Sequence, residues 1–315
     1  MKIAVTGGLG FVGSHLIEKL LKSGHEVVSL DRVSDAKKAT AADVSGAKLI
    51  KCDILDREKL LDSTSGSDCI VHLAASRIMK ESMHKPFEYN RINIDGTVSV
   101  LEAARVNGIG RVIFASSSAV YGNNLRPPQK EDSVLYPPNP YGVSKLTGEK
   151  YCHVYWENFG VQAVSLRLFN VYGPGQDKGA GAIMPFIDCA LRHADPVIYG
   201  SGFQSRDFIY VDDAADAFLK CIMLSRNTKK LGGKSINIGS GVNYSILEIL
   251  KEIEGVSGTP FSIIRSEKLA GDVQNTFANI KLARRLLNWK PRMPLKEGIK
   301  KTYDWYCGMF QTKEK

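Results

Sequence analysis

The sequence predicts an α/β protein in which a doubly wound parallel sheet is followed by a smaller α/β domain. Through residues 1–170, short apolar runs alternate with helical patterns, and strands that alternate with helices form right-handed crossovers in a parallel sheet. A glycine-rich turn follows the first apolar run. After residue 170 the elements become shorter and are joined by Gly- and Pro-containing connections.

The individual elements follow from the spacing of apolar residues. Between the first two apolar runs, apolar side chains recur at helical spacing and Gly24 ends the pattern, which predicts the first helix. The expected strands of the sheet are 2–6, 26–30, 48–51, 69–73, 111–115 and 162–168. Amphipathic helices are expected later at 212–224, 245–253, 280–287 and 294–310.

The length of 315 residues suits a nucleotide-binding domain with a smaller one appended. We expect residues 1–170 to bind the nucleotide cofactor, with 207–238 returning to that domain. Residues 171–315 are expected to bind the substrate. With 43% hydrophobic and 24% charged residues, the composition argues against collagen-like, coiled-coil and disordered chains.

The charge balance raises the question of a nucleic-acid or membrane-surface partner, because 42 Lys and Arg face 33 Asp and Glu. The basic residues lack the aromatic interleaving of a nucleic-acid site, so we expect a lysine-rich surface and neither partner. No apolar stretch reaches a membrane span, and the first residues are typical of a strand rather than a signal peptide. Scattered cysteines without metal-ligand spacing predict no metal site and a cytoplasmic protein.

A phosphate-binding turn is predicted at Thr6-Gly-Gly-Leu-Gly-Phe-Val-Gly13, between the first strand and the first helix. Gly7, Gly10 and Gly13 allow a tight turn and a close approach of a pyrophosphate to the helix N-terminus. The alternative spacing uses Gly8 in place of Gly7, and the alternative interpretation is a tight turn without a ligand. The candidate cofactor contacts of this turn are Gly7, Gly10, Phe11, Val12 and Gly13.

The second strand ends at Asp31, where a carboxylate accepts hydrogen bonds from ribose hydroxyls and repels a 2′-phosphate. This position favours NAD over NADP, although Asp31 could instead be a turn residue. Arg32 beside it could pair with a 2′-phosphate, which leaves some use of NADP open.

The fifth strand runs into Ser116-Ser-Ser118, which places hydroxyls at the carboxyl end of a parallel strand. Further on, Asn139-Pro140 predicts a helix start, with Tyr141 and Lys145 on one face of that helix. A nearby ammonium favours the phenolate, so the pair could supply a base. Alone, this spacing is usually an ordinary solvated pair.

With these residues, the chain resembles the extended short-chain dehydrogenase/reductase family, and within it the NAD-dependent sugar-nucleotide epimerases and dehydratases. The resemblance covers nearly the whole chain and is closest to UDP-glucose and UDP-N-acetylglucosamine 4-epimerases. Besides the motifs above, it rests on Asp53-Ile54, His72-Leu-Ala-Ala75, Asn93-Ile-Asp-Gly-Thr97, Arg167-Leu-Phe-Asn-Val-Tyr-Gly-Pro-Gly175, Arg206-Asp-Phe-Ile-Tyr-Val-Asp-Asp213 and Trp289-Lys-Pro291.

The resemblance implies a Rossmann-type fold with NAD as cofactor, and it assigns roles to residues along it. Asp53 and Ile54 would lie at the adenine, with Asn93 supporting the cofactor and Lys145 on the nicotinamide ribose. Ser117 would hydrogen-bond the sugar 4-hydroxyl while Tyr141 removes its proton. The remaining candidate cofactor contacts are Leu73, Ala74, Ala75 and Ser116, and Ser116 and Ser118 could be structural or line the substrate.

The expected reaction is inversion of carbon 4 of a UDP sugar. By resemblance, dehydratases and decarboxylases of the family carry acids just before Tyr121-Gly122, where this chain has Ser118 and Ala119. A dehydratase, decarboxylase or reductase remains the alternative within enzymes. A regulatory protein that senses NAD is the alternative from another class, and it would have little reason to keep Ser117, Tyr141 and Lys145 together.

The resemblance also implies substrate contacts. Asn170 and Arg206 would bind the diphosphate, although relatives usually carry another arginine where this chain has Leu269, and Arg265 or Lys268 could replace it. Thr276 is small enough to suggest room for a 2-acetamido group. The other candidate substrate contacts are Arg77, Ser118, Tyr199, which could equally be a half-buried strand residue, and Asp272. A homodimer is expected through helices near 89–107 and 141–158.

Overall fold

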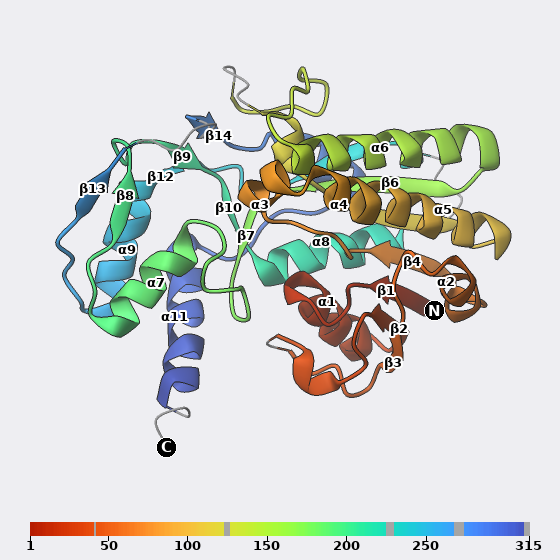
Figure 1. Cartoon of the computed structure of the whole chain (residues 1–315), viewed down its shortest axis with the longest axis horizontal. Helices are drawn as coiled ribbons and strands as arrows, with labels where there is room; N and C mark the ends of the chain where they lie inside the picture. Colours follow the sequence, from red (N-terminus) through yellow and green to blue (C-terminus); the bar gives the residue numbers. More distant parts are fainter. Residues whose placement is uncertain (41, 123–126, 225–229, 268–273, 312–315) are drawn as a thin grey trace.

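The computed structural model describes residues 1–40, 42–122, 127–224, 230–267 and 274–311. Within these residues, seven parallel strands form the main sheet in the order β11-β6-β5-β4-β1-β2-β3 (Figure 1). The strand order reverses at β1, so the carboxyl ends of β1 and β4 flank a crevice. The strands are β1 (Lys2–Thr6), β2 (Glu26–Asp31), β3 (Lys48–Lys51), β4 (Cys69–His72), β5 (Arg111–Ser117), β6 (Gln162–Leu168) and β11 (Ser235–Ile238).

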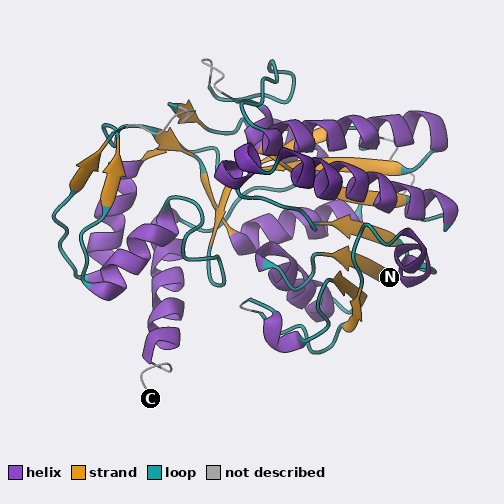
Figure 2. Ribbon diagram, viewed as in Figure 1, coloured by secondary structure: helices purple, strands orange, loops and turns teal. Residues whose placement is uncertain are grey.

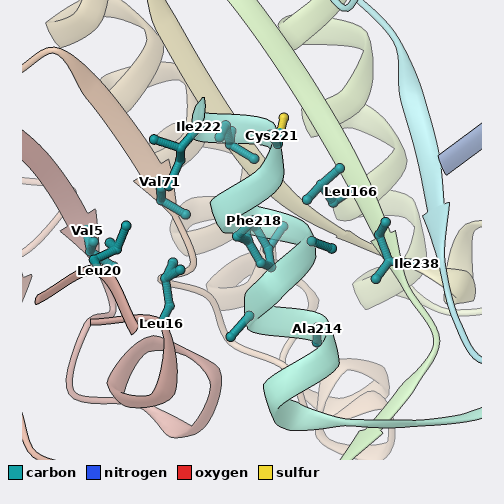
Figure 3. Packing of buried hydrophobic residues seen from close by; sticks show 14 of the residues in the cluster. Val5, Leu16, Leu20, Val71, Leu166, Ala214, Phe218, Cys221, Ile222 and Ile238 are labelled. Carbon is teal, nitrogen blue, oxygen red and sulfur yellow. The ribbon is translucent and has the colours of Figure 1, made fainter. Parts of the chain in front are cut away.

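Helices cover both faces of the main sheet (Figure 2). Successive side chains of a strand point to opposite faces, and in β1 the side chains of Ile3 and Val5 enter one core while Ala4 enters the other. The first core packs against α1 (Phe11–Lys22) and α8 (Val211–Met223). Figure 3 shows Phe218 of α8 at its centre, with Leu16 of α1 and Val71 of β4 beside it.

The second core lies under helices from the first half of the chain. It is formed by α2 (Arg57–Thr64), α5 (Gly96–Val106) and α6 (Pro140–Phe159), which pack on the face that holds Ala4. Three short helical segments precede α5: α3 (Met79–His84), α4 (Pro86–Asn90) and a π-helical turn at Arg91–Asp95. Two 3₁₀ turns, at Ala36–Lys38 and Ser118–Val120, follow β2 and β5.

The rest of the chain builds a smaller unit with its own core at one end of the sheet (Figure 1). Ile187 of α7, Ile249 of α9 and Ile299 of α11 are fully buried in that core. Its helices are α7 (Ile183–Arg192), α9 (Ile246–Ser257) and α11 (Leu295–Gln311), whereas α10 (Lys281–Leu287) returns to the main sheet and buries Ala283 and Leu287 in the first core. Its strands are β7 (Asn170–Tyr172), β8 (Val197–Tyr199), β9 (Ser205–Arg206), β10 (Phe208–Tyr210), β12 (Tyr244–Ser245), β13 (Ile264–Ser266) and β14 (Asn275–Thr276).

The predicted α/β fold with a parallel sheet is confirmed, and the predicted strands agree with β1 to β6 within two residues. The largest difference is at β5, which continues to Ser117 because Ser116 and Ser117 pair with Arg167 and Leu168 of β6. The strand therefore carries its serines directly to the crevice. No helix in the described ranges is both long enough and apolar enough to cross a bilayer.

Candidate active site

The carboxyl ends of the main-sheet strands open into a cavity of about 560 Å³. Cavities of this size bind small molecules and cofactors in other proteins. Every site residue predicted from the sequence and described in the structure lines this cavity, except Asn93 and Tyr199. The predicted contact Asp272 lies outside the described residues, as do Lys268 and Leu269.

One end of the cavity is formed by the glycine turn. Gly7 has a φ of 69°, and its N–H donates to the carbonyl of Leu30 at 2.8 Å. A Cβ on Gly7 would lie 2.7 Å from the nitrogen of Ala74, and one on Gly13 would lie 2.3 Å from the carbonyl oxygen of Gly7. Any larger residue would therefore displace main chain at these two positions. Of the two spacings, the one with Gly7 rather than Gly8 lines the cavity.

The same turn is suited to a pyrophosphate. Helix α1 starts after Gly10 without a side-chain cap, and a Cβ on Gly10 would have a single neighbour, the carbonyl of Gly7 at 3.2 Å. An uncapped helix N-terminus presents unpaired N–H groups and a positive dipole end to an anion. The turn therefore fits the phosphates of a dinucleotide.

Two aspartates lie further along the cavity, beyond the turn. Asp31 accepts hydrogen bonds from the backbone N–H of Arg32 at 2.8 Å and of Leu9 at 3.3 Å, which fixes its carboxylate at the end of β2. Asp53 and Ile54 line the wall beside it. The Arg32 side chain is exposed. This end offers the carboxylate that a ribose diol requires.

A buried hydrogen-bond chain supports the wall at Ala74. Thr97 donates to the carbonyl of Asn93 at 2.6 Å, so its oxygen accepts from Nε2 of His72 at 3.1 Å. The other ring nitrogen, Nδ1, then accepts from the Thr6 hydroxyl at 2.8 Å. Burial lowers the pKa of His72 to about 3, so the ring is neutral. The sequence motif contains His72, but its role depends on partners that are distant in the chain.

Asn93 is 2% exposed and supports the cavity from behind rather than lining it. Its side chain accepts from the N–H of Ser76 at 2.8 Å and donates to the carbonyl of Ser76 at 2.9 Å. It also donates to the hydroxyl of Ser144 at 3.0 Å. Asn93 thus ties the loop after β4 to helix α6.

Ser117, Tyr141 and Lys145 all line the cavity, and the side chains of Ser117 and Tyr141 are hydrogen-bonded to each other. Helix α6 begins at Pro140, where the side chain of Asn139 accepts from the N–H of Gly142 at 2.9 Å. This cap places Tyr141 in the first turn, one helical turn before Lys145, and Ser117 ends the neighbouring strand β5. Three residue types suited to proton transfer therefore converge from two elements.

Burial and neighbouring groups act in opposite directions on the pKa of Tyr141. Burial raises the pKa of Tyr141, while a hydrogen bond with Ser117 and the positive charge of Arg77 lower it. Lys145 donates to the carbonyl of Ala115 at 2.8 Å, and burial lowers the pKa of Lys145 to about 8. Burial is the largest of the effects on Tyr141, so the pKa of its phenol lies above the ordinary value for a tyrosine.

A buried ion pair holds α6 against the sheet. Arg167 on β6 donates to both carboxylate oxygens of Glu149 at 2.8 Å, and both side chains are 4% exposed. Glu149 lies one turn beyond Lys145 on the same helix. The hydroxyl of Ser116 donates to Glu149 at 2.5 Å, so this predicted cofactor contact lines the cavity with its hydroxyl already paired.

The other end of the cavity belongs to the smaller unit. Asn170, Arg206 and Thr276 line it, and Thr276 lies beside Arg206 in adjacent parallel strands. Asn170 donates to the carbonyl of Asp207 at 2.8 Å. Ser118 lines the cavity from the main sheet.

Two arginines that were expected to contact the substrate differ in their position relative to the cavity. Arg77 lines the cavity and pairs with Asp177 of the loop between β7 and α7, whereas Arg265 donates to the carbonyl of Ser201 at 3.0 Å and does not line the cavity. Tyr199 also lies outside the lining, 40% exposed on β8, with the ammonium of Lys80 5.7 Å from its ring centre.

Sequence reasoning missed part of the wall. Gln176, Ala180 and Gly181 line the cavity from the loop between β7 and α7. The glycines of this segment indicated a connection, and nothing in their pattern indicated that the loop would fold back over the strand ends.

Comparison with known proteins agrees with this geometry. Residues 3–239 match the model of the NAD dependent epimerase/dehydratase family. The chain is 34% identical over 313 residues to the UDP-glucose 4-epimerase of Mycolicibacterium smegmatis, covering 97% of this chain and 98% of that protein. It is 33% identical over 316 residues to a UDP-N-acetyl-alpha-D-glucosaminuronate decarboxylase of Bacillus cytotoxicus, covering 96% of each.

The fold of this chain is also similar to a solved structure. The UDP-N-acetylglucosamine 4-epimerase of Methanobrevibacter ruminantium, in complex with UDP-N-acetylmuramic acid, superposes with a TM-score of 0.90 at 32% identity and covers 98% of both chains. The cofactor of the family is NAD, and the glycine turn and Asp31 fit it. This chain belongs to the NAD-dependent epimerase/dehydratase family.

Proposed function

We propose that this protein is a 4-epimerase that inverts carbon 4 of a UDP sugar with NAD as cofactor. The observation that favours this reaction is the distribution of carboxylates. Among the described residues that line the cavity, the carboxylates are Asp31 and Asp53, both beyond the glycine turn and away from Tyr141. A 4-epimerase needs one base at carbon 4, whereas elimination from the sugar needs a further acid or base.

In this proposal Tyr141 accepts the proton of the sugar 4-hydroxyl. Ser117, which hydrogen-bonds Tyr141, orients that hydroxyl for the proton transfer. Lys145, whose ammonium donates to the carbonyl of Ala115, contributes positive charge to the wall of the cavity. Bound NAD supplies a reversible hydride acceptor at carbon 4 and a cationic ring, so a transient 4-keto sugar can be reduced on either face.

We assign one end of the cavity to NAD and the other end to the UDP sugar. Residues 1–170, with 207–238, hold NAD through the glycine turn, Asp31 and Asp53. Residues 171–315 hold the UDP part, and Arg206, together with Asn170 at the boundary between the two parts, binds the diphosphate. A guanidinium suits this role because its planar donors match phosphate oxygens.

Thr276 supports a sugar with a 2-acetamido group as one substrate. It is 8% exposed, lies in β14 beside Arg206 and faces the cavity with a short side chain. We therefore propose UDP-N-acetylglucosamine in addition to UDP-glucose and UDP-galactose. Thr276→Tyr should lower kcat/KM for the N-acetylated sugar on the order of 10-fold or more while sparing UDP-glucose, whereas Thr276→Ser should leave both. Equal turnover of the N-acetylated sugar by Thr276→Tyr would refute this assignment.

A dehydratase or decarboxylase is the second candidate, because the relatives include the B. cytotoxicus decarboxylase at 33% identity. To separate the candidates, the purified protein is incubated with UDP-glucose, UDP-N-acetylglucosamine, UDP-glucuronic acid and dTDP-glucose without added NAD. Our proposal predicts the carbon-4 epimer of a UDP sugar. A 4-keto-6-deoxy sugar, release of CO₂ or dependence on added NADPH would favour the second candidate.

We also propose a homodimer. Helix α6 exposes Val143, Val154 and Phe159 by 45%, 43% and 52%, respectively, whereas Tyr155 on the same helix is 6% exposed. Apolar side chains exposed on a long helix suit a second copy of the chain. Light scattering coupled to size-exclusion chromatography should give twice the chain mass, and replacing Val154 and Phe159 by Lys should reduce that value toward the monomer.

A further inference from the structure

Asp207 is a fully buried carboxylate that the proposed reaction leaves without a role. It lies between β9 and β10, directly after Arg206, and it does not line the cavity itself. Burying a carboxylate is unfavourable unless hydrogen bonds replace the water that it loses. The partners of Asp207 therefore indicate what the buried charge holds together.

The carboxylate of Asp207 is saturated with hydrogen bonds from two segments that are distant in the chain. Oδ1 accepts from the N–H of Ser240 at 2.6 Å and from the hydroxyl of Ser240 at 2.7 Å. Oδ2 accepts from the N–H of Gly241 at 2.9 Å and from the N–H of Ala278 at 3.0 Å. A carboxylate has about four acceptor positions, and a donor meets each of them here.

The main chain of Asp207 contacts the residues that we propose to hold the substrate. Its carbonyl accepts from the side chain of Asn170, on β7, at 2.8 Å. Its N–H donates to the carbonyl of Thr276, on β14, at 2.9 Å. Arg206 precedes it in the chain and pairs with Thr276 between β9 and β14. Asn170, Arg206 and Thr276 come from three different strands, and Asp207 is a neighbour of all three.

The carboxylate also ties β9 to both strands that flank it. In the three-stranded sheet, β9 lies between β12 and β14. Ala278 lies just after β14, and residues 240–241 belong to the connection from β11 to β12. A Cβ on Gly239, in the same connection, would lie 2.7 Å from Oδ2 of Asp207, so this connection packs closely on the carboxylate. The strand that carries Arg206 is therefore held from two sides.

We propose that Asp207 is a positioning residue of the substrate site: by tying β9 to the segments beside β12 and β14, its carboxylate places Arg206 where it binds the diphosphate. The inference rests on the proposed function, in which Asn170 and Arg206 hold a UDP sugar. A guanidinium binds phosphate oxygens through planar donors with a defined geometry. A small displacement of Arg206 should therefore weaken the binding of UDP and spare NAD, which we assign to the other end of the cavity.

Asp207→Asn keeps the shape of the side chain and removes part of its acceptor capacity. In either orientation of the amide, its NH₂ group would face at least one main-chain N–H that now donates to the carboxylate. Calorimetry on the NAD-loaded protein measures the dissociation constant of UDP. We expect this constant to rise on the order of 10-fold, with bound NAD unchanged. With UDP-glucose as substrate, KM should rise while kcat stays near the wild-type value.

Ser240→Ala is a milder variant of the same test. It removes one hydrogen bond from the carboxylate and leaves the main-chain N–H of residue 240 in place. Ser240 does not line the cavity, so it has no direct contact with the proposed ligand. We expect the dissociation constant of UDP to rise by about 2- to 5-fold. This variant decides the test if Asp207→Asn does not fold.

Asp213→Asn is the matched control. Asp213 is also a buried carboxylate, and it accepts from the N–H groups of Arg292 and Met293 at 3.0 and 2.9 Å. Because it does not line the cavity and lies outside the β9 cluster, its substitution should lower Tm and leave the affinity for UDP unchanged. An equal loss of affinity in Asp213→Asn, or wild-type affinity in Asp207→Asn and Ser240→Ala, would overturn the proposal.

Arg206→Gln distinguishes a failure of this inference from a failure of the proposed function. It removes the guanidinium that we place on the diphosphate, so it should weaken UDP at least as much as Asp207→Asn. If Arg206→Gln weakens UDP and Asp207→Asn does not, the positioning role is wrong and the proposed function stands. If the wild-type protein does not bind UDP, or Arg206→Gln binds it as tightly as wild type, the diphosphate assignment is wrong and the inference is overturned with it.

Discussion

The buried ammonium of Lys145 gives a prediction whose size follows from the structure. Lys145 is 4% exposed, and burial lowers its pKa from 10.5 to about 8. Between these two values the unfolded chain binds a proton that the folded chain has released. The free energy of unfolding therefore rises with pH across this window, because stability increases wherever the unfolded state binds more protons.

The magnitude can be worked from the two pKa values, 10.5 for the unfolded chain and about 8 for the folded one. At about pH 7 both states are charged, and the difference destabilises the folded protein by about 3 kcal/mol. At about pH 9.5 most of the folded protein is already neutral and the destabilisation falls to about 1 kcal/mol. Lys145 should therefore add about 2 kcal/mol of stability over this pH interval.

The perturbation is Lys145→Met, which keeps the length of the side chain and removes its charge. Urea unfolding of wild type and variant, at equal NAD concentration, gives the free energy of unfolding at each pH. The difference between the variant and wild type should shrink by about 2 kcal/mol from about pH 7 to about pH 9.5. Lys150→Met, on the exposed side of the same helix, is the control and should show no such change.

Parallel pH curves for wild type and Lys145→Met would refute this reasoning. Such a result would mean that the ammonium is solvated in the folded protein, and the tight packing of Lys145 beneath Ala115 and beside the ring of Phe114 would then be wrong.

Three further substitutions test other parts of the site. Gly13→Ala should abolish NAD binding and lower Tm, because the new Cβ would lie 2.3 Å from the carbonyl of Gly7. Equilibrium dialysis with NAD measures the loss, and wild-type affinity would contradict the assignment of the glycine turn to NAD. Tyr141→Phe should lower kcat by about 10³-fold while bound NAD and Tm stay unchanged, and appreciable residual turnover would remove Tyr141 as the base. Glu149→Gln should destabilise the protein by about 3 to 5 kcal/mol in urea unfolding, because it leaves the buried charge of Arg167 unpaired, and a loss under about 1 kcal/mol would argue that the pair is solvated.

The sequence was sufficient to predict the features that depend on local pattern. Alternating apolar runs predicted the strands, and the strand-turn-helix context of Gly7 to Gly13 predicted the cradle that lines the cavity. Ser117, Tyr141 and Lys145 come from two elements that parallel sheet topology brings together, so their convergence could also be expected.

The sequence was insufficient where a role depends on partners far apart in the chain. The contact of Arg77 with Asp177 joins residues separated by 100 positions, and no periodicity signals it. The tautomer of His72 depends on Thr6 and Thr97 on its two sides. The pKa of Tyr141 depends on burial and on the hydrogen bond with Ser117, which the spacing of Tyr141 and Lys145 does not indicate.

The central claim is that carbon 4 is inverted by removing and returning the same hydrogen. UDP-glucose carrying deuterium at carbon 4 is incubated with the purified protein without added NAD, and the products are followed by nuclear magnetic resonance. Our account predicts UDP-galactose with the deuterium retained at carbon 4 in both epimers. Deuterium found at carbon 6, in the solvent or in an external NAD pool, or a product without the galacto configuration, would contradict it.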